Sequence, residues 1–331
     1  MTLTEILVGI AGDGLNPSLR PLLERPLDAE SWQAFVTKLD QLMLSTFALA
    51  ACEQGTLAVT EPQLEDLRLR SEQATERCER AASSLEEVVT TLDRHGLDAC
   101  VLHGAATSAL DYPATHLRLY ESVHVLVDHT QHDQAVDVLR ADGVFRHPNV
   151  HSRARRRRDV WHRTKSGVEV GLYRAVTPGR FGGAIESKDL LANRVWFTPR
   201  TDPGGTALSA LGTEERMIAA CIHARFDRSI SNLLVQRDVV QLVLRDDLSM
   251  RRVEELRAEW RVEAILADAV RRAWDTFSVP DVVPISAWSG FYQPYRRDQR
   301  KLEAHPLPAT HRREANIDSS VADAAPQRLE P

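Results

Sequence analysis

The stretch RLYESVHVLV, residues 118–127, decides how this sequence folds. Three valines stand at alternate positions within it, and successive side chains of a β-strand point to opposite faces. The alternation therefore predicts a strand over residues 122–127 whose valines point into a core. Ser122 and His124 then share the other face of the strand, which is the geometry that a paired set of ligands requires.

Two further stretches carry a similar pattern on either side of this strand. Upstream, residues 99–106 read ACVLHGAA, a short apolar run that ends at a histidine and a glycine. Downstream, apolar residues at 168, 170 and 172 alternate with Glu169, Gly171 and Tyr173, which predicts a half-buried strand. We expect a sheet with strands near residues 99–103, 122–127, 158–163 and 167–173.

These features stand in an order that resembles a known family. The order is His103-Gly104, then Tyr112-Pro113, then Arg118, then a strand that ends in Leu126-Val127. It is similar to the bacterial nucleotidyltransferase-like families of the DNA polymerase β superfamily, over roughly residues 30–275. The resemblance implies an α+β fold, in which a small mixed β-sheet of nucleotidyltransferase type is flanked by N-terminal and C-terminal helical regions.

The sequence departs from that family at the positions that hold its metal ions. There, two aspartates spaced D-x-D on a strand bind magnesium for nucleotidyl transfer, and a neighbouring strand supplies a third acidic ligand. The matching positions are Ser122 and His124 for the pair and Glu169 for the third. His103 stands where the family usually has lysine, and Gly171 where it often has histidine. Because Mg²⁺ prefers carboxylate oxygens, a hydroxyl and an imidazole form a poor ligand set. We expect no metal and no other cofactor.

The catalytic candidates are His124, Glu169 and His103, because they occupy or flank the positions of the ancestral metal site. Histidine titrates near physiological pH, and a carboxylate in the same pocket could orient an imidazole for proton transfer. The alternative is a polar residue in a degenerate pocket for His124, and a solvated position on an edge strand for Glu169. Ser122 is disfavoured as a nucleophile, because no nucleophile elbow surrounds it.

The candidates for substrate binding are Arg118, Ser122, Gly104 and Tyr173. Gly104 would let a substrate approach the backbone closely. We interpret Arg118 either as an anion ligand or as a residue that orients the strand after it. The expected pocket has His124 and Glu169 in its wall and His103 and Arg118 at its rim.

Composition and charge narrow the classes of partner. The formal net charge of −6 gives no overall attraction to nucleic acid. The basic run Arg153–Arg158 lacks interleaved aromatic residues, so we interpret it as a solvated loop. Four cysteines without a C-x-x-C pair predict neither a zinc site nor a disulfide framework. No apolar run is long enough for a membrane helix, and no secretory signal is evident. We therefore expect a cytoplasmic protein with a small-molecule substrate and neither a membrane nor a nucleic-acid partner.

The distribution of glycine, proline, charged and apolar residues along the chain predicts five regions. Glycine and proline dominate the first of them, and the last is rich in proline, alanine and charge with few large apolar residues. The regions are an irregular lead (1–30), an N-terminal helical region (31–97), a nucleotidyltransferase-like α/β core (98–205), a C-terminal helical region (206–290) and a disordered tail (291–331).

Three classes of function remain open. The first is a degenerate nucleotidyltransferase fold repurposed for metal-independent acid/base chemistry, such as cyclisation, isomerisation or elimination, on an organic substrate. The second is an active nucleotidyltransferase with a non-standard metal site that uses Glu169, Glu121, Asp128 and substrate phosphates. The third is a non-catalytic binding or scaffold pseudoenzyme. High Arg and Ala usage with few lysines resembles high-GC actinobacterial proteins and favours a bacterial, specialised-metabolite setting. We favour the first class.

Overall fold

The computed structural model describes residues 2–15, 23–145, 160–176, 185, 187–199, 205–226, 232–295 and 298–299. Its helices are α1 (Leu3–Gly12), α2 (Ala29–Leu42), α3 (Ser45–Glu53), α4 (Glu61–Arg94), α5 (Ala105–Asp111), α6 (His132–Ala141), α7 (Ser187–Ala192), α8 (Thr213–Phe226), α9 (Asn232–Val243), α10 (Met250–Glu259), α11 (Glu263–Phe277) and α12 (Pro284–Phe291), with a 3₁₀ turn η1 (Thr115–Leu117). Its strands are β1 (Ala99–Leu102), β2 (Ser122–Val127), β3 (Val160–Arg163), β4 (Glu169–Tyr173), β5 (Arg194–Phe197) and β6 (Leu208–Leu211). The basic run Arg153–Arg158 and most of the predicted tail lie outside the described residues.

The described strands form one mixed sheet in the order β3-β4-β2-β1-β6-β5. β2 lies between β1, to which it is antiparallel, and β4, to which it is parallel. β1 is parallel to β6, and the two edge strands pair antiparallel with their neighbours. The α+β class and the four predicted strands are confirmed. The sequence pattern does not predict β5 and β6, because the segments RVWF and LSAL are too short to show a period.

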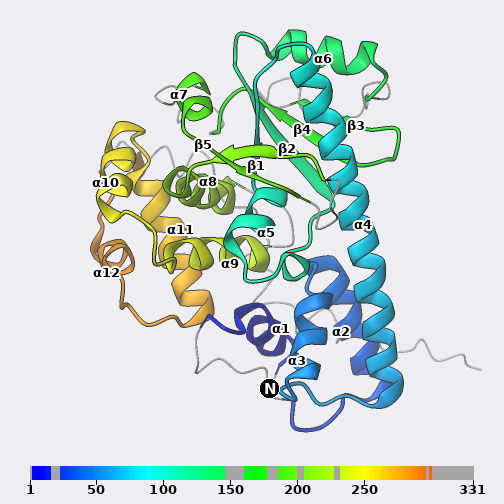
Figure 1. Cartoon of the computed structure of the whole chain (residues 1–331). Helices are drawn as coiled ribbons and strands as arrows, with labels where there is room; N and C mark the ends of the chain where they lie inside the picture. The colour runs from blue at the N-terminus through cyan, green and yellow to red at the C-terminus, as the bar shows by residue number, and fades with distance from the viewer. Residues whose placement is uncertain are drawn as a thin grey trace, which may run out of the picture.

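The two faces of the sheet pack against different helices. On one face, the β2 residues Val123, Val125 and Val127 are buried in a core with side chains of α4 and α6, as the alternation predicts. On the other face, Cys100 and Leu126 join a larger core with α1–α3 and the C-terminal helices. Figure 1 shows α8 and α9 beside this second face. The polar positions of β2 therefore face the C-terminal helices, away from α4.

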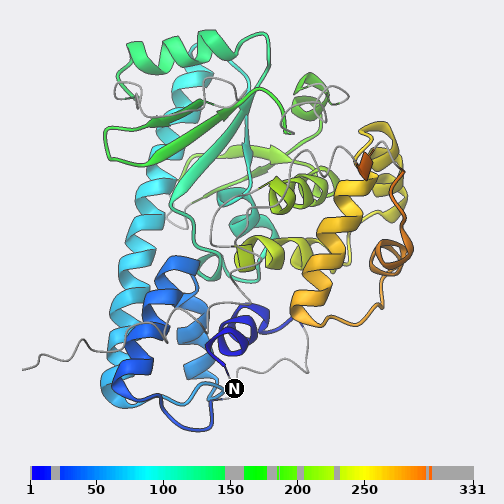
Figure 2. The same cartoon turned by 180° about the vertical axis from the view of Figure 1, so that it is seen from behind.

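Helix α4 connects the N-terminal helices to the sheet. It begins with a capping box in which the backbone N–H of Thr60 donates to Oε1 of Gln63 at 2.9 Å. Figure 2 shows the helix along one side of the molecule, from α2 and α3 at one end to the sheet at the other. None of the helices in the described part of the chain combines the length and the apolar character needed to cross a bilayer.

Part of the segment 1–30, which its glycines and prolines predicted to be an irregular lead, is helical. Residues 3–12 form α1, which starts with a capping box between Thr2 and Glu5. Its side chains Ile6, Leu7 and Ile10 are buried in the larger core. Glycine inside a helix costs about 1 kcal/mol, whereas each buried apolar side chain contributes about 1.5–3 kcal/mol. Packing against the C-terminal helices therefore outweighs the weak helix propensity.

Candidate functional site

The site begins at His103, directly after β1. The chain turns there through two residues with positive φ, His103 at 52° and Gly104 at 40°. Such a conformation costs a residue with a side chain about 1–3 kcal/mol, whereas glycine adopts it readily. A Cβ on Gly104 would lie 3.3 Å from Cβ of Tyr120, so the turn also packs closely on its neighbour. The turn holds the imidazole of His103 edge-on to that of His124, with 5.8 Å between the ring centroids.

His124 lies between two hydroxyl groups on the polar face of β2. Its Nε2 is 3.2 Å from Oγ of Ser122, and its Nδ1 is 2.9 Å from the hydroxyl oxygen of Tyr173 on β4. A neutral imidazole has one donor and one acceptor nitrogen, and a hydroxyl can fill either role. We call this arrangement the Ser–His–Tyr chain; it fixes the orientation of the imidazole.

Gly171 makes the contact between His124 and Tyr173 possible. It pairs directly with His124 across β2 and β4, and Tyr173 lies two residues further along the same face. A Cβ at Gly171 would approach Cε2 of Tyr173 to 2.6 Å, which is shorter than a van der Waals contact. The absence of a side chain at this position lets the tyrosine ring fold back over the strand and stack at 5.6 Å on His124.

A third imidazole comes from α8. His223 stacks on His103 with 4.3 Å between ring centroids and an interplanar angle of 18°. It also meets His124 edge-on at 5.8 Å. We call His103, His124 and His223 the histidine cluster. Sequence reasoning missed His223, and its one signal was a histidine within an otherwise apolar stretch of a predicted helix.

The three imidazoles of the histidine cluster lie in a partly buried environment. All three histidines, with Ser122 and Tyr173, are only partly buried, so each retains some contact with solvent. Desolvation holds the pKa of His103 well below its usual value, and positive charge on His223, His124 and Arg118 lowers it further. His103 is therefore neutral at neutral pH.

Arg118 forms a buried ion pair with Asp238. Its Nε and Nη2 donate to the carboxylate of Asp238 on α9 at 2.8 Å each, and its Nη1 donates to the carbonyl of Leu119. The side chains of Arg118 and Asp238 are only 4% and 3% exposed, and the hydroxyl of Tyr112 donates to the same carboxylate at 2.8 Å. Of the two interpretations of Arg118, the geometry matches a residue that positions the segment before β2, because its three nitrogens already have protein partners.

Glu169 and His124 each have other partners. The carboxylate of Glu169 accepts from Nη2 of Arg163 on β3 at 3.0 Å, and both side chains are about half exposed, at 52% and 53%. Both nitrogens of His124 lie beside hydroxyl groups. Glu169 therefore sits at the solvated end of β4, and it is Tyr173, not Glu169, that is hydrogen-bonded to His124.

The residues present do not fit the magnesium site of the family. Of the three matching positions, Ser122 and His124 are hydrogen-bonded to each other, and the carboxylate of Glu169 accepts a hydrogen bond from Arg163. The ring of Tyr173 covers the space beside Gly171. Within the described residues, no group of three or more His, Cys, Asp and Glu side chains is arranged to hold a metal ion.

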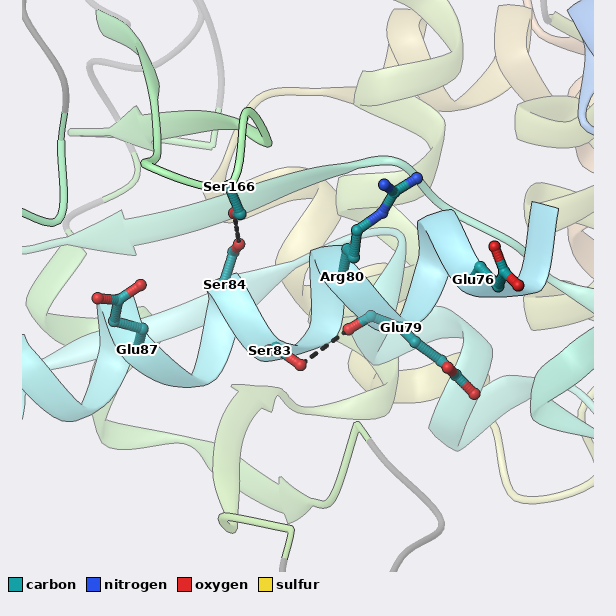
Figure 3. A pocket seen from close by; sticks show the side chains of 7 residues that line it. All are labelled: Glu76, Glu79, Arg80, Ser83, Ser84, Glu87 and Ser166. Atoms are coloured by element: carbon teal, nitrogen blue, oxygen red, sulfur yellow. Dashed lines mark hydrogen bonds between the residues drawn. The ribbon is translucent and has the colours of Figure 1, made fainter. Parts of the chain in front are cut away.

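A separate groove follows α4 on the other side of the sheet. It has a volume of about 490 Å³ and is lined by Glu76, Glu79, Arg80, Ser83, Ser84, Glu87 and Ser166. Figure 3 shows Ser84 bonded to Ser166 of the β3–β4 turn, at 2.7 Å, while the carboxylates project from the helix. The buried Ser84 joins α4 to the sheet, and the charged residues line the solvent side of the helix. The groove contains none of the predicted site residues and has the character of a solvated helix face.

Comparison with known protein families gives a match over most of the chain. A family model described as "uncharacterised nucleotidyltransferase" matches residues 28–278, which confirms the resemblance seen in the sequence. Among solved structures, an antigenic nucleotidyltransferase-like protein from Paracoccidioides brasiliensis is similar at 12% identity and a TM-score of 0.35, covering 70% of this chain and 96% of that one. That likeness is too distant to carry an argument. No curated protein matches the sequence.

Proposed function

This chain belongs to the uncharacterised nucleotidyltransferase family, and from that premise we propose that its site performs metal-independent acid/base chemistry on an organic substrate. The reaction class is a cyclisation, isomerisation or elimination, in which a proton leaves one atom of the substrate and another atom gains one. The setting is specialised metabolism in a bacterium. The observation that carries the proposal is the Ser–His–Tyr chain, in which Ser122 and His124 stand at the positions that match the paired metal ligands of the resembling proteins.

His124 is the general acid/base of the proposed reaction. A positioned imidazole contributes about 10²–10⁴-fold to a proton transfer when its orientation and tautomer are fixed. Tyr173 fixes the orientation of the ring from the Nδ1 side, at 2.9 Å. Nε2 then takes or delivers the proton, either directly or through the Ser122 hydroxyl at 3.2 Å. Tyr173 is a positioning residue in this scheme, since it acts through the imidazole.

His103 supplies a second neutral base at the edge of the same cluster. Its depressed pKa keeps the ring unprotonated, and its strained turn fixes its position against β2. Strain of this kind persists where surrounding structure enforces it, and it is concentrated at functional sites. Glu169 has no part in the proton transfer, because its carboxylate is paired with Arg163 in a half-exposed position.

Solvent deuterium exchange tests the proposal on a mixture of candidate substrates. The full chain is incubated in D₂O and EDTA with fractionated small-molecule extracts of bacteria, and mass spectrometry records compounds that gain deuterium or change mass. We expect the wild type to label or convert at least one compound. His124→Gln should lower that rate by about 10²–10⁴-fold, and Tyr173→Phe should lower it less.

Two controls separate chemistry from folding. His116 is an exposed histidine of η1, and His116→Gln should leave the rate unchanged. All variants should keep the wild-type circular dichroism spectrum and thermal midpoint within error. A rate that survives His124→Gln in a folded protein, or a complete absence of labelling by the wild type, would contradict the proposed function.

A further inference from the structure

Strand β5 ends the sheet, and within the described residues its outer edge pairs with no other strand. The strand order stops at β5, and neither of the isolated bridges involves it. Figure 1 shows β5 at the end of the sheet opposite β3. An edge strand presents unpaired N–H and C=O groups to which another strand can add, and many proteins block such an edge with a proline or a bulge. The RVWF sequence of β5 contains no proline, and its register with β6 is continuous.

The register with β6 shows which backbone groups of β5 face outward. The N–H of Gly212 donates to the carbonyl of Asn193 at 3.1 Å, just outside the pair that Arg194 forms with β6. That pair is therefore of the non-hydrogen-bonded kind. Because the two kinds of pair alternate along an antiparallel ladder, Val195 bonds to β6, whereas Arg194 and Trp196 direct their N–H and C=O groups away from it.

Trp196 is a large apolar side chain exposed at this edge. It is 66% exposed, although the next residue of the strand, Phe197, is buried. The same face of β5 carries Arg194, whose Nη1 donates to Oδ1 of Asp98 at 3.1 Å. An exposed tryptophan leaves a large apolar area in water, and tryptophan and arginine are the residue types that contribute most often to binding between proteins.

We propose that β5 pairs antiparallel with β5 of a second copy of this chain, about a two-fold axis at Val195, so that the two sheets join into one. In a two-fold antiparallel pair, one residue lies opposite its own copy. With Val195 at the axis, Arg194 lies opposite the partner's Trp196, and the outward-facing groups of both residues form hydrogen-bonded pairs. The interface goes beyond the proposed function, since β5 carries no residue of the histidine cluster.

This register is self-complementary on both faces of the strand, which is why a second copy fits it. On one face, the guanidinium of Arg194 lies beside the indole of the partner's Trp196, and symmetry repeats the contact. Arginine and tryptophan form a favourable cation–π pair. On the other face, the two copies of Val195 are directly opposite each other in a non-hydrogen-bonded pair, where side chains come closest. Val195 is partly buried against the core of its own sheet, so the valine pair extends an apolar layer.

The other two-fold registers use the edge less completely. An axis at Arg194 or at Trp196 would leave the other of these two residues opposite a position outside the four-residue strand. It would also remove the pairing of the guanidinium with the indole. The axis at Val195 is therefore the register in which every outward-facing backbone group of β5 is paired within the strand.

Sedimentation velocity of the full chain measures the association directly. A strand of four residues makes a small interface, and interfaces that bury less than about 1,200 Å² belong to weak complexes. We therefore expect a dimer whose dissociation constant lies between about 1 and about 100 µM. As the protein concentration is raised through that range, the mass should rise from 37.1 kDa toward twice that value.

A charge at Trp196 tests the edge itself. Trp196→Arg places a guanidinium opposite the partner's Arg194, so like charges face each other, and it should weaken the dimer by at least about tenfold. Leu69→Arg is the matched control, because Leu69 is an apolar side chain of α4 that is 52% exposed; it should dimerise as the wild type does. Thermal midpoints identify a variant that fails to fold, and Trp196→Ser then replaces Trp196→Arg.

A single cysteine at the axis tests the register. In Val195→Cys, the two thiols would lie across a non-hydrogen-bonded pair with Cα atoms about 4.5 Å apart, which is within the range that a disulfide spans. Mild oxidation with copper phenanthroline should then give a covalent dimer on a non-reducing gel. Thr198→Cys, at an exposed position beyond the end of β5, keeps the dimer contacts but separates the thiols, so it should not cross-link. The wild type, whose four free cysteines are partly or fully buried, should not cross-link either.

Three results would each overturn the β5 interface. They are a wild type that stays monomeric at about 300 µM, a dimer as tight in folded Trp196→Arg as in the wild type, and a Val195→Cys protein that gives no more covalent dimer than Thr198→Cys. None of these measurements needs turnover. Failure of the deuterium labelling would therefore reject the proposed function and leave the interface in place.

Discussion

Two ion pairs of similar length but opposite environment provide the sharpest test of how the site is held together. In the first, Arg118 and Asp238 are 4% and 3% exposed, and Tyr112 donates to the same carboxylate. In the second, Arg163 and Glu169 are 53% and 52% exposed. The comparison separates a residue that holds the fold from one that faces water.

Asp238→Asn removes the charge that balances the buried guanidinium of Arg118. Breaking a buried pair from one side costs about 3–5 kcal/mol, because the remaining charge stays desolvated without a partner. The change also weakens the acceptor of the Tyr112 hydroxyl. Against a total stability of about 5–15 kcal/mol, this is a large fraction. Glu169→Gln should cost about 0–1 kcal/mol, since solvent and salt screen the exposed pair.

Urea unfolding of both variants and the wild type, followed by circular dichroism, measures the two costs side by side. The loss in Asp238→Asn should appear as a lower midpoint at an unchanged slope, since the slope reports the surface exposed on unfolding. Raising the salt concentration should narrow the small Glu169→Gln difference and leave the Asp238→Asn difference in place. A cost below about 1 kcal/mol for Asp238→Asn would refute the structural role of Arg118.

Three further predictions concern the pH response and two glycines. His162 is buried and stacked on Phe145 at 4.2 Å, and desolvation lowers its pKa to about 4. The unfolded chain therefore binds more protons than the folded chain between pH 6.5 and pH 4. The free energy of unfolding should fall as pH drops through that window, by about 3 kcal/mol for this group. In His162→Phe, the urea midpoint should depend less on pH over the same window. Gly171→Ala, whose Cβ would meet Tyr173 at 2.6 Å, should destabilise by about 1–3 kcal/mol and shift the ¹⁵N resonances of His124, whereas unchanged resonances would mean that the ring need not move. Gly290→Ala lies at an exposed helical position of α12, and its new Cβ would be 3.4 Å from Nη1 of Arg271. It should instead raise the free energy of unfolding by about 0.5–1 kcal/mol, seen as a higher urea midpoint.

The strands of the core could be predicted because they carry a period. The three valines of β2 alternate with polar residues, and the same alternation marks β4, so both strands and the face of each side chain follow from the sequence alone. β5 and β6 are four residues long and show no period, and no motif of the resembling family marks them, whereas such a motif marks the equally short β1. The sequence does not predict α1, because nearby glycines and prolines indicate an irregular segment. The helix is stabilised by burial against helices that are distant in the sequence.

The candidate site could be predicted in position but not in its contacts. The period of β2 places Ser122 and His124 on one face, and the structure confirms that placement. The partners of that face depend on tertiary packing. Gly171 has no side chain and so leaves room for the ring of Tyr173 beside His124. His223 reaches the cluster because α8 packs on the sheet. The carboxylate that pairs with Arg118 lies 120 residues away along the chain, and no local pattern indicates such a contact.

The most direct test of the central claim, that a hydrogen-bonded histidine has replaced the metal site, is the magnesium dependence of nucleotide binding. Calorimetric titration of the full chain with ATP is carried out once with excess MgCl₂ and once with EDTA. Because Ser122 and His124 supply no carboxylate and Glu169 is paired with Arg163, we predict the same heats and the same affinity in both titrations. ATP binding that tightens at least about tenfold with Mg²⁺, and loses this gain in Glu169→Gln but not in His124→Gln, would contradict the account and identify an active nucleotidyltransferase.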